Sequence, residues 1–293
     1  MITLLQGYQS LIALCMINAL LALSQYVVLR AGVFSLATAG FAASGAYTAA
    51  NLILHDEFGL INAMVASAFS GMVAALVLSI PLSRLRGVYQ AIATLAFVQI
   101  VVSLAYYMDG LTGGATGLNG IPKIVATWHI AAVLLAAVFL ISRLSASPTG
   151  LAFDVIRQEE TVAVSLGIKV DQHHVLAFAI SGLVAGAAGG LMAGYDYSVV
   201  PEEFGFNMLV AALSFVVLGG RRSPWGPIAG AIVLTLLPEI ARPLSENRMV
   251  IYGVILIVVI VYLPNGLVDT LLLHNIRSVR ARQAAMTEGS GVE

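Results

Sequence analysis

Long apolar segments separated by short polar stretches follow one another along almost the whole chain. Several of them approach the ~20 apolar residues that an α-helix needs to cross the hydrocarbon core of a bilayer. The pattern therefore predicts an all-α, polytopic transmembrane helical bundle with about nine spans, within a range of eight to ten. The predicted spans are residues 11–29, 32–54, 60–80, 88–107, 124–142, 173–194, 206–220, 226–242 and 249–268.

The longest polar stretch, residues 145–172, lies between the fifth and sixth predicted spans. Pro148, Thr149 and Gly150 form a turn signal near its start, and Gly167 marks a helix end. Between them, apolar residues recur at spacings of three, four and seven, which predicts a short amphipathic helix: Ala152, Val155, Ile156, Val162, Ala163 and Leu166. Such a helix either docks on a partner protein or lies at the lipid interface, and amphipathy is compatible with both.

Composition supports a membrane protein. Of the 293 residues, 59% are hydrophobic and 10% are charged, whereas a soluble domain carries about 25% charged residues.

The net charge of −1 provides no overall positive field for nucleic acid. Cys15 is the only cysteine, so the chain forms no internal disulfide. No Lys or Arg precedes the first apolar segment, so we expect a retained span there rather than a cleaved signal peptide.

Basic residues indicate the orientation, because cytoplasmic loops are enriched in Lys and Arg. If residues 145–172 face the cytoplasm, all but three of the 14 Lys and Arg residues lie on that side, the exceptions being Lys123, Arg242 and Arg248. This bias predicts an external N-terminus and a cytoplasmic C-terminus. Residues 1–275 are predicted to form one transmembrane domain, followed by a short polar cytoplasmic tail at 276–293.

Small residues are distributed unevenly among the predicted spans. Four glycines recur every four residues in the sixth span and form one bare helix face: Gly182, Gly186, Gly190 and Gly194. A bare face of this kind predicts close packing against another helix. Residues 32–46 are also rich in Gly and Ala, which suits close packing or a broken helix. The seventh span ends in a Gly- and Pro-rich stretch at 219–227, and such interruptions are associated with transport sites.

Uncharged polar residues occur inside several predicted spans. Most residues of this kind hold helices together, and a minority line a path for a solute. The candidates for a translocation path are Asn18, Ser35, Ser44, Thr94, Gln99 and Ser214.

Other kinds of chemistry have no matching pattern in the sequence. The chain lacks the Gly-rich phosphate-binding loop that ends in Lys-Ser or Lys-Thr, so we expect no ATP hydrolysis by the chain itself. His173 and His174 are adjacent, so they point to different helix faces and suit a membrane interface better than a shared metal ion. We expect no catalytic residue, metal or cofactor. Acidic residues lie mainly in loops or at span ends, which disfavours a proton- or sodium-coupled carrier.

An ordered set of motifs runs along most of the chain. The first is Arg84-Leu-Arg-Gly-Val-Tyr-Gln-Ala-Ile-Ala-Thr-Leu-Ala-Phe97. The others occupy residues 111–118, 120–122, 150–168, 177–182, 219–220, 225–227 and 262–266. In this order, the set resembles the LivM-type permease subunits of branched-chain amino-acid ABC importers. Residues 32–38, Gly-Val-Phe-Ser-Leu-Ala-Thr, depart from the usual Gly-Gln-x-Ser-Leu-Gly-His. Relatives carry aliphatic amino acids, urea, short amides or aromatic acids, and the sequence does not select among these solutes.

The resemblance implies an ABC importer permease that forms half of a translocation path in the bacterial inner membrane. Its implied partners are a related LivH-type permease, two cytoplasmic ATPases, and a periplasmic or lipid-anchored solute-binding protein, in addition to membrane lipid and without nucleic acid. The helix at 151–167 would be the coupling helix that contacts an ATPase, and the residues assigned to this role are Arg157, Glu159, Glu160 and Gly167.

Two other classes of protein remain as alternatives. A stand-alone secondary carrier or channel for a small polar solute would be favoured by buried Asp or Glu pairs. A membrane-embedded enzyme would be favoured by clustered His and carboxylate side chains at one membrane face. The 145–172 stretch and the absent ATP-binding motif favour the importer subunit over both.

Overall fold

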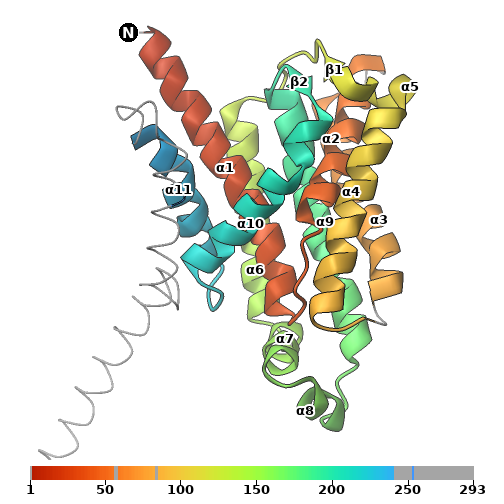
Figure 1. The fold of residues 1–293 in the computed structure, drawn as a ribbon. Coiled ribbons are helices and arrows are strands. Elements are labelled where there is room, and N and C mark those ends of the chain that lie inside the picture. Colours follow the sequence, from red (N-terminus) through yellow and green to blue (C-terminus); the bar gives the residue numbers. More distant parts are fainter. Residues whose placement is uncertain (1, 56–58, 83–84, 241–252, 254–293) are drawn as a thin grey trace, which may run out of the picture.

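The computed structural model describes residues 2–55, 59–82, 85–240 and 253. The ninth predicted span, 249–268, apart from Gly253, and the predicted tail, 276–293, lie outside these residues. The described chain is a helical bundle with one small pair of strands (Figure 1). Its longer helices are α1 (Ile2–Arg30), α2 (Thr38–His55), α3 (Leu60–Leu82), α4 (Val88–Tyr107), α6 (Thr127–Ser145), α9 (Val170–Tyr195), α10 (Phe206–Gly219) and α11 (Trp225–Ile240).

The shorter elements lie at the two ends of the bundle (Figure 1). Helices α7 (Pro148–Gln158) and α8 (Glu160–Ser165) form one end. The opposite end carries α5 (Asp109–Thr112), η1 (Gly114–Thr116), η2 (Pro201–Phe204) and an antiparallel pair of strands, β1 (Leu118–Asn119) and β2 (Ser198–Val199). The register of this pair places Leu118 opposite Val199 and Asn119 opposite Ser198.

Within the described residues, six helices are long and apolar enough to cross a membrane. They include α1, α3, α4, α6 and α9, and the sixth runs from η2 through α10 as Pro201–Gly219. Helix α2 has 18 residues but is rich in Ala, and α11 has only 16 residues. These two helices correspond to the predicted spans 32–54 and 226–242, but neither is among the six helices that are long and apolar enough to cross a membrane.

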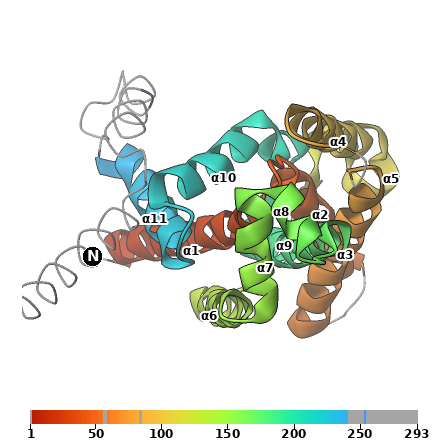
Figure 2. The same ribbon diagram turned by 90° about the horizontal axis from the view of Figure 1, so that it is seen from below.

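The glycine-rich helix α9 is the centre of the bundle. It packs against α1, α2 and α3 (Figures 1 and 2). Gly182 and Gly186 lie against Gly71 of α3, while Gly45 of α2 approaches Gly186 from another side. Gly190 faces Ser67, and Gly194 faces Val125 in the segment before α6. Backbones approach this closely because no Cβ atom stands between them.

The second predicted span is wrong at its start, because residues 32–37 are not helical. Helix α1 ends in a Schellman motif, in which the amide of Val33 donates to the carbonyl of Val28 and the amide of Gly32 to that of Leu29. Gly32 has a φ of 85°, a conformation that costs a glycine little. The chain then stays non-helical until α2 begins at Thr38. The Gly- and Ala-rich stretch therefore contains a break followed by a packing face.

The prediction of a single amphipathic helix at 151–166 is also wrong, because the structure has two shorter helices, α7 and α8, in this region. Ser147 caps an earlier start, with Pro148 in the first turn, and Glu159 interrupts the helix in an extended conformation. The break divides the predicted apolar stripe between two sides. Ile156 and Ala163 are buried in a cluster with Val170 at the start of α9, whereas Val162 and Leu166 are 48% and 66% exposed.

Candidate functional site

Helix α7 is attached to the bundle at its first turn. The hydroxyl of Ser147 accepts a hydrogen bond from the amide of Gly150, which caps the helix. Gly150 leaves no space for a side chain, because a Cβ there would lie 2.6 Å from the carbonyl oxygen of Ser145 at the end of α6. The α6–α7 corner is therefore tight, and α7 crosses the end of the bundle seen from below in Figure 2.

A partly buried ion pair joins α7 to the end of α1. The Nε and Nη2 atoms of Arg30 donate to the two carboxylate oxygens of Asp154 at 3.1 and 2.9 Å. Nη1 donates to the hydroxyls of Tyr26, at 3.3 Å, and of Ser145. The Arg30 side chain is 10% exposed and that of Asp154 is 33% exposed. We call the four residues Tyr26, Arg30, Ser145 and Asp154 the Arg30 cluster.

Sequence reasoning missed this cluster. Arg30 contributed only to the orientation argument, and Asp154 was one polar residue on an amphipathic helix. The two residues are 124 positions apart, so no local spacing relates them. The sequence feature that could have indicated the cluster is the basic residue at the end of a span, because long basic side chains at such positions commonly pair with polar groups.

The four predicted coupling residues have different surroundings. Arg157 is half-buried, Glu159 is exposed and accepts a hydrogen bond from the Thr161 hydroxyl at 2.6 Å. Glu160 forms an ion pair with Arg86 at 2.8 Å, and Arg86 also reaches Asp171 at 3.1 Å. Gly167 follows α8 with a φ of 78°. The structure thus brings Glu160 against the α3–α4 connection and leaves Glu159 open to a partner.

The outer surface of α8 is apolar as well as exposed. Val162, Val164 and Leu166 expose 48%, 60% and 66% of their surface. Glu159, Thr161 and Ser165 are exposed beside them. Val162 and Leu166 lie one helical turn apart, and Val164 projects from another side of that turn; we call these three exposed side chains the α8 patch. An apolar patch with a polar rim at the tip of a molecule is typical of a docking surface.

Two of the predicted path residues, Ser35 and Thr94, meet at the non-helical segment 32–37. The Thr94 hydroxyl accepts from the amide of Leu36 at 3.0 Å, and Nε2 of Gln25 donates to the carbonyl of Ser35 at 2.6 Å. The side-chain Oε1 of Gln25 in turn accepts from the Thr38 hydroxyl. Broken helices inside a membrane need such partners for their free backbone groups, so Gln25 belongs with the predicted residues here.

The other four predicted path residues are separate from this segment. Asn18 on α1 donates to the hydroxyl of Thr235 on α11 at 3.0 Å. The Ser44 hydroxyl donates to the carbonyl of Phe41, and its own carbonyl accepts from Ser70 of α3. Ser214 is buried in α10, while Gln99 is exposed on α4. The structure therefore does not gather all six residues along one surface of this chain.

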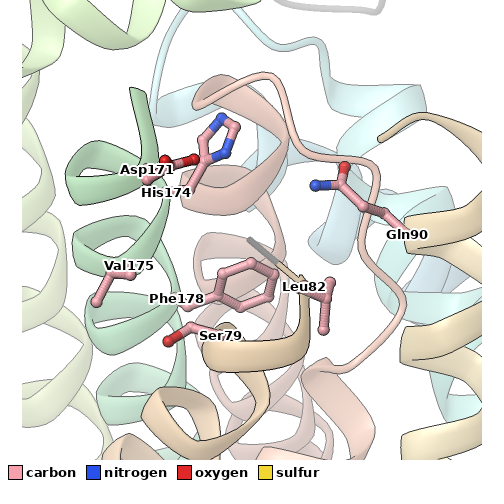
Figure 3. Close-up of a pocket in the computed structure, with 7 residues that line it drawn as sticks. All are labelled: Ser79, Leu82, Gln90, Asp171, His174, Val175 and Phe178. Carbon is pink, nitrogen blue, oxygen red and sulfur yellow. The ribbon is translucent and has the colours of Figure 1, made fainter. Parts of the chain in front are cut away.

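A small pocket lies between α3, α4 and α9, close to the ion pairs of Arg86 (Figure 3). It leaves no room for a water molecule and is lined by Ser79, Leu82, Gln90, Asp171, His174, Val175 and Phe178. His174 is only 6% exposed, and neither of its ring nitrogens has a hydrogen-bond partner among the described residues. The interfacial position of the two histidines stays a prediction, and the burial shows only that neighbouring helices cover His174 at the start of α9.

Metal ligands do not converge in the part of the chain that the structure describes, where no three His, Cys, Asp or Glu side chains are placed to hold one ion. The strand end of the bundle instead carries exposed acidic side chains, Glu202 and Glu203. Burial raises the pKa of the nearby Asp196, and Lys123 partly opposes this effect. This end thus combines acidic groups with the β1–β2 pair, far from α7 and α8 (Figure 1).

Comparison with known proteins identifies the family. A family model described as "Branched-chain amino acid transport system / permease component" matches residues 7–260. The high-affinity branched-chain amino acid transport system permease protein LivM of Escherichia coli (strain K12) is 31% identical over 297 residues, which cover 89% of this chain and 70% of LivM. LivH of the same strain is 30% identical over 146 residues, covering 48% of this chain and 45% of LivH.

A more distant relative transports a different kind of solute. The autoinducer 2 import system permease protein LsrC of Klebsiella pneumoniae is 28% identical over 163 residues, covering 53% of this chain and 44% of LsrC. No solved structure matches the chain. Because the family model covers most of the chain and the similarity to LivM extends over nearly all of it, the chain belongs to the branched-chain amino-acid transport permease family and is a multi-pass permease subunit of an ABC importer.

Proposed function

We propose that this subunit forms half of a solute path in the bacterial inner membrane and receives motion from a cytoplasmic ATPase through α7 and α8. The observation that carries the proposal is the α8 patch, which exposes three apolar side chains at the tip of a helix pair joined to two spans. Helix α6 leads into α7, and α9 follows α8 closely. A partner that displaces α7 and α8 therefore pulls on both spans.

The partners follow from the family and from the sequence. The chain has no phosphate-binding loop motif, so we assign ATP hydrolysis to two separate cytoplasmic ATPase subunits. Similarity to both LivM and LivH suggests a pair of related permeases. The acidic end around Glu202 and Glu203 is the surface that we assign to a periplasmic or lipid-anchored solute-binding protein.

The solute class follows from the relatives. LivM and LivH are named for branched-chain amino acids, and LsrC for autoinducer 2. We therefore propose branched-chain or other small hydrophobic amino acids, or amide-like solutes. Competition for uptake between leucine, urea and short amides distinguishes among them.

Docking of α8 on the ATPase predicts a specific defect for Val164→Asp. A buried interfacial anchor typically contributes more than 1 kcal/mol, so a charge at this exposed position should lower ATPase association about tenfold or more without unfolding the bundle. Co-purification of the ATPase with the membrane-inserted variant measures the effect. Val88→Asp is the matched control, because Val88 is 73% exposed and starts α4 at the same end of the bundle.

The lipid-interface alternative predicts another outcome for the same variants. If Val164→Asp keeps full ATPase association and full uptake, α8 is an interfacial helix and the docking proposal is wrong. Loss of association in both Val164→Asp and Val88→Asp would also contradict it, because the effect would then not be specific to α8.

The proposed orientation predicts which side of the membrane reaches each end of the bundle. In a Cys15→Ser background, a membrane-impermeant maleimide should label Glu203→Cys from outside and Ala146→Cys only after the membrane is opened. Ala146 and Glu203 are both exposed, so a cysteine at either position is accessible to the reagent. Labelling of both cysteines from one side would contradict a bundle that places α7 and η2 on opposite membrane faces.

A further inference from the structure

The Arg30 cluster connects three elements that are far apart in the chain. Arg30 and Tyr26 belong to the last turns of α1, Ser145 is the last residue of α6, and Asp154 lies in the middle of α7. The guanidinium contacts all of the other three side chains. Helix α7 is therefore held to α1 at its centre as well as to α6 at its beginning.

The contact between Arg30 and Asp154 restricts orientation as well as distance. Two parallel N–H···O bonds join the planar guanidinium to the carboxylate, which fixes the angle between the groups. The Arg30 side chain is 10% exposed, so its charge depends on Asp154 as a counterion. In contrast, the ion pair between Arg86 and Asp171 has side chains that are 43% and 66% exposed and makes a single hydrogen bond.

The backbone after Arg30 also lies directly against α7. A Cβ atom on Gly32 would be 3.1 Å from Cα of Arg157, one turn along α7 from Asp154. Gly32 begins the non-helical segment 32–37, which Gln25 and Thr94 hold by hydrogen bonds to its backbone. The end of α1, the start of this segment and the centre of α7 therefore form one continuous contact.

We infer that the Arg30–Asp154 pair is the attachment through which α7 moves α1 and the segment 32–37 during transport. This inference rests on the proposed function, in which α7 and α8 receive motion from an ATPase. The helix pair continues directly into α6 and α9 and packs on α9 through Ile156 and Ala163, whereas the Arg30 cluster and the Gly32 contact link it to α1, which is distant in the chain. Arg30 and Asp154 are thus positioning residues that extend the motion to a third span and to the residues around Ser35 and Thr94.

The decisive variant is Asp154→Asn, tested in the complete transporter with its ATPases and solute-binding protein. The amide has nearly the same shape as the carboxylate but no charge, so the fixed pairing with Arg30 is lost. We expect ATPase association and ATP hydrolysis to stay within about twofold of the unmodified transporter, while uptake falls about tenfold or more. Asp171→Asn is the matched control, and its uptake should change less than about twofold because exposed ion pairs contribute little.

The pattern of losses separates this inference from the proposed function. If α8 docking fails, Val164→Asp has no effect on ATPase association, whatever Asp154→Asn does. If the attachment inference fails, Asp154→Asn either transports normally or loses ATPase association and hydrolysis together with uptake. Only retained hydrolysis with lost uptake indicates that ATPase motion no longer reaches the path.

A cysteine pair gives an independent result if Asp154→Asn does not assemble. Arg30→Cys with Asp154→Cys, in the Cys15→Ser background, removes both charges together, so neither remains buried without a partner. The unbridged protein should hydrolyse ATP with little uptake, and a short bifunctional maleimide that joins the two cysteines should restore uptake. If the bridge instead blocks uptake, α7 and α1 must separate during the cycle, and the inference is overturned.

Discussion

Replacing Gly186 with alanine should destabilise the bundle. At an exposed position inside a helix, the same replacement stabilises the helix by about 1 kcal/mol. A Cβ atom at Gly186 would touch the backbone oxygen of Ser67 and lie 2.9 Å from Cα of Gly71. In turn, a Cβ atom on Gly71 of α3 or on Gly45 of α2 would lie 2.6 Å from Cα of Gly186. Backbone atoms on both sides leave no flexible side chain that could move away.

The expected size of the effect follows from overpacking. Extra methylene groups in a packed core cost about 1–3 kcal/mol, so Gly186→Ala should lower the thermal midpoint of the purified subunit by roughly 2–10 °C. Gly186→Leu should prevent assembly, because three helices must move apart. Size-exclusion chromatography in detergent, followed over a temperature series, measures both effects.

Gly110→Ala serves as the control for Gly186→Ala. Gly110 lies in the short helix α5, and a Cβ there would meet nothing within 4 Å. We therefore expect no loss of stability. If Gly186→Ala were as stable as Gly110→Ala, the close contact of α9 with α2 and α3 would be wrong.

Replacing Gly117 with alanine should open the strand end of the bundle while leaving the spans folded. Gly117 has φ 66° and ψ −176°, a conformation that is essentially restricted to glycine and costs other residues about 1–3 kcal/mol. A Cβ there would also contact the carbonyl oxygen of Val199 and lie 2.9 Å from Cα of Val200. The β1–β2 pair, which begins at the next residue, would have to separate.

Limited proteolysis of the outer connections measures this opening. A strain of about 1.4 kcal/mol or more raises the open population about tenfold, and cleavage follows that population when reclosing is fast. Gly120→Ala is the control, since Gly120 also has a positive φ of 82° but its nearest atom, the Tyr197 hydroxyl oxygen, would be 3.8 Å from a Cβ. Equal cleavage of the two variants would show that the contact with β2 contributes nothing.

Much of the architecture was predictable because it depends on local patterns. Apolar segments of sufficient length determine where helices cross a membrane, and this signal located the helices that became α1, α3, α4, α6 and α9. The four-residue glycine spacing identified the bare face of α9 without reference to its partners. Gly167 follows α8 because the amides of Gly167 and Ile168 close the helix onto Val164 and Ala163, which is again a local effect.

The candidate site was predictable only in part. The 145–172 stretch and Glu159 follow from polarity and position, and Glu159 is exposed. The break at Glu159 could not be predicted, because the buried cluster of Ile156 and Ala163 is completed by Val170 of another helix. Likewise, hydrogen bonds with the side chains of Gln25 and Thr94 stabilise the non-helical segment before α2, and neither residue belongs to that segment.

The sequence by itself determined a helical membrane permease with a bare glycine face and a polar connection suited to docking. Hydropathy and spacing act within about 20 residues of chain, which is enough to specify a span or a helix face. Only the tertiary structure decided which surfaces meet: Gly186 with Gly71 and Gly45, and Arg30 with Asp154. These contacts depend on how separate helices pack, and pairing over 124 residues leaves no periodic trace in a single sequence.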